Sequence, residues 1–260
     1  MVTRASEGTA VTVDLYPSSW ADAASAVRED GTVVVAGGTG IQPWLNTATA
    51  RPTALVHLSR VAQAWDTEHS AGELTIGAMV AVDHPVLTPC FGGEGIGWFA
   101  TPAVRRRATA VGNVVSRLGP RELATPLVAL GARLHSHGHA GSWQSLEEVL
   151  REGLPPGRLA TRLRLHIPER IVYHRMSARR RLSRVELGVC AALGPGCGAA
   201  IVIGSGAAAV RVDTSDSAAA NFVAAIRAQA AAMSDDARRI ATVTALAARV
   251  HRDLHGRTGR

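Results

Sequence analysis

A glycine-rich turn follows a β-branched stretch near the amino terminus and could bind a phosphate. Residues 32–36 read Thr-Val-Val-Val-Ala, and residues 37–40 read Gly-Gly-Thr-Gly. Glycine leaves backbone N–H groups accessible and adopts unusual backbone angles at the least cost. The spacing matches neither the dinucleotide-binding fingerprint, because no third glycine and no clear helix follow at Gln42-Pro43, nor a P-loop, because Gly-Lys-Ser/Thr is absent. These residues alone leave a phosphate site and an ordinary tight turn both open.

Few other residues are spaced for catalysis or metal binding. His135, His137 and His139 alternate, so on a strand they would share one face and could hold zinc; we favour an exposed polar strand. The three cysteines form no Cys-x-x-Cys pair, which excludes an iron–sulfur cluster held by this chain alone. The chain has no lysine and therefore no Schiff-base chemistry from a lysine side chain. No catalytic acid, base, nucleophile or metal ligand is assigned.

The most specific signal lies in residues 98–113, which read Trp-Phe-Ala-Thr-Pro-Ala-Val-Arg-Arg-Arg-Ala-Thr-Ala-Val-Gly-Asn. This segment resembles the signature of the FAD-binding domain of molybdenum hydroxylases, the medium-subunit family of xanthine dehydrogenase and carbon monoxide dehydrogenase. Stretches similar to other motifs of that family occur in the same order, at residues 36–41, 55–60, 74–78, 122–132 and 173–193 and in the last helix. The chain is therefore identified as a divergent member of this family.

The resemblance implies an α+β fold of the PCMH/VAO type. Residues 1–168 would form the FAD-binding domain, with subdomains at about 1–55 and 56–168, and residues 169–260 a smaller domain of antiparallel sheet plus helices. FAD would lie with its diphosphate on residues 34–41 and under residues 109–113, beside the aromatic Phe99 and with hydroxyl groups bound by Glu122. The implied cofactor-binding residues are Val34, Val35, Ala36, Gly37, Gly38, Thr39, Gly40, Ile41, Phe99, Thr109, Val111, Gly112, Asn113 and Glu122.

The implied function is that of an FAD-dependent oxidoreductase, either a subunit of a molybdenum hydroxylase-type dehydrogenase or a stand-alone relative. In the multi-subunit enzymes, a molybdopterin subunit hydroxylates the substrate, an iron–sulfur subunit relays electrons, and the flavin passes them to NAD, a quinone or oxygen. This chain could supply only the flavin step. Iron–sulfur and molybdopterin subunits are therefore the expected partners, with a homo-oligomer or monomer as the alternative, and a small molecule as substrate or acceptor.

Two departures from the family pattern keep other functions open. Val111 stands where the family has the first glycine of a Gly-Gly pair, and a β-branched residue there would resist positive φ and fill the space of a phosphate. The segment between Ala78 and Trp98 is also short. A divergent member that uses the cleft for non-redox small-molecule binding or catalysis is one alternative, and an assembly subunit without a ligand is another.

The elements that would position these motifs mix helix and strand. Ser18 or Ser19 predicts the cap of a helix that ends near Arg28. Strands are predicted at residues 32–36, 54–58, 74–78, 132–139 and 159–167, a loop at 81–97, a glycine turn at 109–115, and helical spacing at 122–134. Three strands within residues 185–212 and two alanine-rich helices, at about 217–233 and 235–254 with Ser234 or Asp235 as the second cap, complete the chain.

The amino-acid composition limits which classes of protein this chain can belong to. With 260 residues, 47% of them hydrophobic, the chain can bury a substantial core. Its apolar runs are far shorter than the roughly 20 residues that span a bilayer, so we expect a cytoplasmic protein without a membrane partner. The net charge of +7 comes from arginines spread along the chain, with short runs only at 105–107 and 179–181. This pattern does not favour nucleic acid as a partner.

Overall fold

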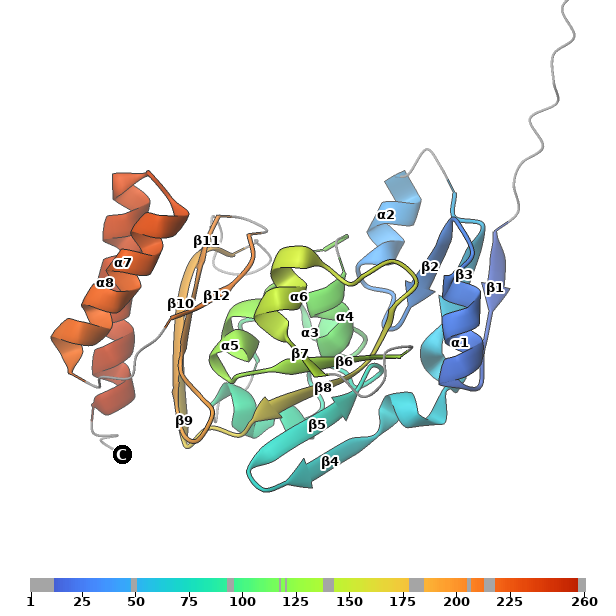
Figure 1. Cartoon of the computed structure of the whole chain (residues 1–260), viewed down its shortest axis with the longest axis horizontal. Coiled ribbons are helices and arrows are strands. Elements are labelled where there is room, and N and C mark those ends of the chain that lie inside the picture. Colours follow the sequence, from blue (N-terminus) through green and yellow to red (C-terminus); the bar gives the residue numbers. More distant parts are fainter. Residues whose placement is uncertain are drawn as a thin grey trace, which may run out of the picture.

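The computed structural model describes residues 12–47, 51–92, 96–116, 118–119, 121–137, 143–177, 185–204, 207–212 and 218–256. In this part of the chain, helices pack against three sheets that follow one another in sequence (Figure 1). The division into domains at residues 168 and 169 stays a prediction. In the described residues, no helix has the length and apolar character needed to cross a membrane.

The first sheet is parallel and places the glycine turn. Its strand order is β1 (Val13–Leu15), β3 (Ala54–His57), β2 (Thr32–Val35), and helices α1 (Trp20–Val27) and α2 (Ile41–Thr47) accompany it. Ser19 caps α1 as predicted, since its side chain accepts a hydrogen bond from the Asp22 N–H at 3.1 Å. The expectation that no helix follows Gln42-Pro43 is wrong. Pro43 lies in the first turn of α2, where its missing N–H costs nothing.

The second sheet is antiparallel and forms the centre of the molecule. Its order is β4 (Thr67–Ser70), β5 (Glu73–Gly77), β8 (Leu159–His166), β6 (Arg133–His137), β7 (Trp143–Ser145). Alternate residues such as Leu74, Leu134 and Leu163 are fully buried in the main core. That core also takes in residues of α4 (Ala110–Val115), α5 (Ala124–Ala129) and α6 (Leu146–Glu152). The opposite face of the sheet carries polar and charged side chains.

The third sheet is antiparallel, with the order β12 (Val210–Val212), β11 (Ala199–Ile203), β10 (Val185–Leu193), β9 (Arg170–Ser177). Helices α7 (Ala219–Met233) and α8 (Ala237–His255) cover one face and enclose a separate apolar core that includes Val189, Ile201 and Ile226. The three predicted strands and two helices are confirmed. The cap of α8 is Asp236 rather than Ser234 or Asp235, because its carboxylate accepts from the N–H groups two and three residues further on.

Other local predictions need correction. Residues 109–115 form no glycine turn but the short helix α4, preceded by α3 (Pro102–Arg105). The predicted loop at 81–97 contains a 3₁₀ segment, η3 (Pro85–Phe91), and two further ones, η1 (Leu58–Arg60) and η2 (Ala62–Trp65), follow β3. The helical spacing at 122–134 yields only α5. His139 and residues 179–181 lie outside the described residues.

Candidate cofactor-binding cleft

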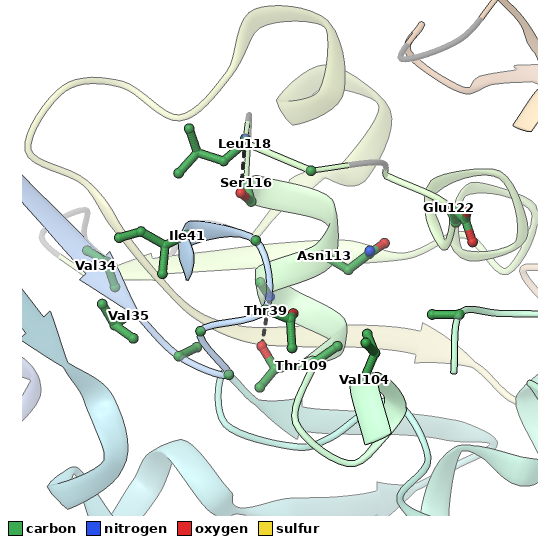
Figure 2. Close-up of a pocket in the computed structure, with 18 of the residues that line it drawn as sticks. Val34, Val35, Thr39, Ile41, Val104, Thr109, Asn113, Ser116, Leu118 and Glu122 are labelled. Carbon is green, nitrogen blue, oxygen red and sulfur yellow. Dashed lines mark hydrogen bonds between the residues drawn. The ribbon is translucent and has the colours of Figure 1, made fainter. Parts of the chain in front are cut away.

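A cavity of about 180 Å³ lies between the turn after β2 and the segment that carries α3 and α4 (Figure 2). Every cofactor-binding residue predicted from the sequence lines it except Val111. The lining also contains small and apolar residues that the sequence analysis did not assign, namely Ala100, Val104, Ala108, Ser116, Leu118 and Gly119. The sequence therefore locates both walls of one cleft, although the walls are far apart in the chain.

The first wall is the turn at residues 37–40. Gly38 has a φ of +74°, which favours glycine. A Cβ on Gly37 would lie 1.8 Å from the carbonyl oxygen of Arg107, so the backbones of the two walls meet at this point. In the described structure, no backbone N–H of residues 37–40 donates a hydrogen bond to the protein. Unpaired N–H groups on a glycine turn are suited to an anion.

The second wall is α4, and Thr109 begins it. The Thr109 side chain accepts a hydrogen bond from the Gly112 N–H at 3.1 Å, which satisfies one of the free donors of the first helical turn (Figure 2). A Cβ on Gly112 would lie 3.9 Å from the Cβ of Ala36, so α4 packs closely on the first wall. The side chain of Asn113 accepts from the Leu123 N–H at 3.0 Å and so fixes the segment that carries Glu122.

Val111 does not enter the cavity. It is 2% exposed, belongs to the main core, and is not among the described residues with positive φ. The expectation that it fills the space of a phosphate is therefore wrong. In a helix, successive side chains point in different directions, so α4 turns Val111 into the core while Gly112 and Asn113 face the cleft.

Phe99 and Glu122 line the part of the cleft that borders the third sheet. Glu122 is 8% exposed, and burial raises the pKa of its carboxyl group, an effect that the nearby Arg175 opposes. Arg175 donates to the Trp98 carbonyl at 2.8 Å and stacks over the Trp98 ring. Tyr173, also on β9, packs edge-on against Trp98 at 5.3 Å. The third sheet therefore supports this end of the cleft.

Ala100 is strained at the edge of the cleft. Its φ of +42° is uncommon for a residue with a side chain, and its neighbour Phe99 is nearly fully buried. The guanidinium of Arg105 holds this bend, because Nη1 donates to the carbonyls of Phe99 and Ala100 at 2.7 and 2.9 Å. The first arginine of the 105–107 run therefore has a structural task that its charge alone did not indicate.

The family described as the FAD binding domain in molybdopterin dehydrogenase matches residues 12–165. This match covers more than half of the chain, and the chain belongs to that family. The sequence-based identification and the cofactor, FAD, are thereby confirmed.

Solved structures of other proteins have a similar fold. The fold is similar to quinoline 2-oxidoreductase from Pseudomonas putida 86, with a TM-score of 0.76, 20% identity, and coverage of 94% of this chain and 96% of that one. It is equally similar to carbon monoxide dehydrogenase from Hydrogenophaga pseudoflava, with a TM-score of 0.76, 16% identity, and coverage of 94% and 96%. These likenesses confirm the predicted fold class.

A curated relative is the alpha subunit of the 6-hydroxypseudooxynicotine dehydrogenase complex of Paenarthrobacter nicotinovorans. It is 28% identical over 133 residues, which are 46% of this chain and 43% of that protein. The similarity in sequence therefore spans less than half of the relative.

The residues of the cleft fit FAD. The turn at 37–40 offers unpaired N–H groups to a diphosphate, and Glu122 is the only ionisable side chain among the described lining residues. Arg107, whose Nε donates to the Gly37 carbonyl at 3.5 Å, adds positive charge beside the same turn. An anion at the first wall thus meets N–H donors and a guanidinium group, with no acidic side chain in the turn itself.

Proposed function

We propose that this chain is the flavin subunit of a multi-subunit dehydrogenase, which receives electrons from partner subunits and passes them to a soluble acceptor. The observation that carries the proposal is a cleft with unpaired N–H groups that is built from two segments 70 residues apart in the sequence. The names of the relatives support it, since one is a subunit of a dehydrogenase complex and another is a form of carbon monoxide dehydrogenase that lacks the Mo-pyranopterin moiety of the molybdenum cofactor.

Each wall has its own task in this proposal. Residues 34–41 bind the diphosphate of FAD through backbone N–H groups, and Thr109, Gly112 and Asn113 enclose it. Glu122 accepts hydrogen bonds from hydroxyl groups of the cofactor, and Phe99 packs beside its ring system. Bound FAD supplies the redox chemistry, while this chain binds it, orients it and limits the access of water.

Partner subunits are part of the proposal. In this complex an iron–sulfur subunit delivers electrons to the flavin, since this chain has no cysteine pair for a cluster, and a molybdopterin subunit oxidises the substrate. A stand-alone flavoprotein is the second candidate within the same class. The non-redox alternative loses its main support, because Val111 lies in the core and leaves the cleft open.

Cofactor identity is tested by denaturing the purified protein and identifying the released flavin by chromatography. The flavin-free protein is then titrated with FAD, FMN and riboflavin in a calorimeter. We expect FAD to bind at micromolar concentration or better, and riboflavin, which lacks the diphosphate, to bind at least about 100-fold more weakly. Absence of FAD binding by a folded protein would overturn the proposal.

The partner subunits are tested by native pull-down followed by iron and molybdenum analysis. Co-purification of iron- and molybdenum-containing chains in constant ratio supports the complex. A yellow protein that is isolated alone from its native host, and that still reduces an acceptor, identifies the stand-alone relative instead.

A further inference from the structure

A second hollow lies on the polar side of the central sheet and shares no lining residue with the FAD cleft. It has a volume of about 370 Å³, within the size range of small-molecule sites. Its lining residues come from strands β6, β7 and β8 and, with Trp20, from the start of α1. The described lining is Trp20, His135, His137, Trp143, Thr161, Arg162 and Arg164. It contains two guanidinium groups, two imidazoles and no carboxylate.

The cationic side chains are held in place by the sheet. The guanidinium carbon of Arg164 lies over the indole of Trp143, 4.3 Å from the ring centroid, in a cation–π contact. The Arg133 side chain donates to the Trp143 carbonyl at 2.6 Å and anchors β7. His135 and Arg162 are opposite each other in the register of β6 and β8, so the pairing brings their side chains together.

The carboxylates nearest to these arginines lie outside the hollow. Asp66 is 3.9 Å from Arg162, and Glu73 is 4.0 Å from Arg164, both at the outer limit of an ion pair and with at least a third of each side chain exposed. Glu73 also lies 3.7 Å from His166, which divides its charge between two partners. Exposed pairs of this length neutralise little of the positive charge.

The pKa of His135 is lowered in part by the positive charge around it. Burial lowers the pKa of His135, and the neighbouring guanidinium and imidazole groups lower it further. The Thr161 hydroxyl donates to the His135 carbonyl at 3.2 Å, and its oxygen lies 2.8 Å from Nδ1 of the His135 ring. A proton on Nδ1 thus has an acceptor, and the doubly protonated ring can form when a negative charge enters the hollow.

We propose that this hollow binds the anionic group of a small molecule, a phosphate or a carboxylate, between Arg162, Arg164 and His135. The two guanidinium groups supply paired N–H donors, and protonated His135 adds a third cationic donor. The Trp20 side offers apolar surface to the body of the ligand. This site is additional to the flavin function and does not depend on it.

Calorimetry on the FAD-loaded protein tests the site, because the bound flavin keeps nucleotides out of the first cleft. The probes are inorganic phosphate, AMP and benzoate. We expect at least one of them to bind one-to-one with a Kd at or below about 1 mM. Tightest binding of AMP identifies a phosphate ester, and tightest binding of benzoate identifies an aromatic carboxylate. Failure of all three to bind would overturn the proposal.

Substitutions distinguish binding in this hollow from unspecific attraction of an anion to a basic protein. Arg162→Gln and Arg164→Gln should each weaken binding at least tenfold, whereas Arg164→Lys, which keeps the charge, should weaken it less. Arg227→Gln on the exposed side of α7 removes the same charge elsewhere and should change nothing. Equal affinity in Arg162→Gln and Arg227→Gln would refute the site. Flavin absorbance and circular dichroism verify that each variant is folded, and NMR titration should show the pKa of His135 rising when the probe binds.

Discussion

The two walls of the FAD cleft both carry glycines that line the cavity, but their backbone structures differ. The first wall is a turn in which glycine is needed because another backbone touches it and because φ is positive at Gly38. The second wall is a helix, α4, in which the N–H of Gly112 is already bonded to the Thr109 side chain. Unpaired N–H donors are therefore concentrated on the first wall, and the second wall supplies shape. Glycines that look alike in a motif can thus differ in their physical role.

Gly37→Ala, on the first wall, should have the largest effect on stability and on FAD binding, and it tests the difference between the two walls most directly. Its Cβ would lie 1.8 Å from the Arg107 carbonyl oxygen, and backbone cannot move aside as a flexible side chain can. We expect a loss of about 3 kcal/mol or more in the free energy of unfolding, with loss of FAD binding. Urea unfolding of the flavin-free protein measures the first, and calorimetry measures the second.

Gly112→Ala is the matched variant on the second wall. The new Cβ would meet the Thr109 hydroxyl oxygen at 2.6 Å, and this side chain can rotate away at the cost of its capping hydrogen bond. Alanine favours the helix by about 1 kcal/mol over glycine, which offsets a capping loss of similar size. A change within about 1 kcal/mol is expected. Equal damage from the two variants would show that the walls do not differ as described.

Val111→Gly should have the second-largest effect on stability and tests the placement of Val111 in the core. Removing a buried side chain and placing glycine inside α4 should cost about 2 to 4 kcal/mol in the free energy of unfolding. The affinity of the remaining folded protein for FAD should change by less than about threefold, because Val111 does not line the cleft. Tighter FAD binding by this variant would instead restore the view that the valine obstructs the phosphate.

The sequence predicts those parts of this fold whose signals are local. Ser19 marks the start of α1, and the β-branched residues at 32–35 mark β2. Strand β4 was missed because all four of its side chains are exposed and show no alternation. Helix α4 was missed because it is short, contains a glycine, and is stabilised by burial of Ala110 and Val114 in a core that only the tertiary structure creates.

The residues of the candidate site also fall into a group that the sequence predicts and a group that it misses. Its glycines and Glu122 were found through an ordered set of family motifs, whereas Ala100, Val104 and Ala108 line the cleft without any chemical signal in their side chains. Val111 was misplaced because the motif gives the order of residues along the chain but not the turn of a helix that decides which side chain faces the ligand.

Thr109→Ala should have an intermediate effect and measures how far the shape of the second wall depends on its cap. The variant removes the acceptor of the Gly112 N–H, and we expect a loss of about 1 kcal/mol in the free energy of unfolding. Thr109→Ser keeps the hydroxyl and should stay within about 0.5 kcal/mol of the natural protein. Urea unfolding of both variants provides the comparison. An unchanged Thr109→Ala protein would contradict the capping role.

Glu122→Gln extends the comparison to the part of the cleft that borders the third sheet. Burial raises the pKa of this carboxyl group, so the folded protein binds a proton there more tightly than the unfolded chain does. Stability of the flavin-free natural protein should therefore fall as the pH rises from the ordinary pKa of glutamate, about 4.3, to the raised one. Glu122→Gln lacks this dependence and should be the more stable protein at pH 8, with the difference vanishing near pH 4.

The same variant should bind FAD up to about tenfold more weakly at pH 8, because an amide accepts weaker hydrogen bonds from hydroxyl groups than a carboxylate does. Glu186→Gln, at an exposed position of β10, is the control for the change in net charge and should alter neither property. Unfolding curves at pH 4 and pH 8 and calorimetry at pH 8 decide the outcome. If Glu122→Gln gains stability at pH 8 but keeps full affinity, the carboxylate is buried at the cleft without contacting the cofactor, and FAD is held by the first wall alone.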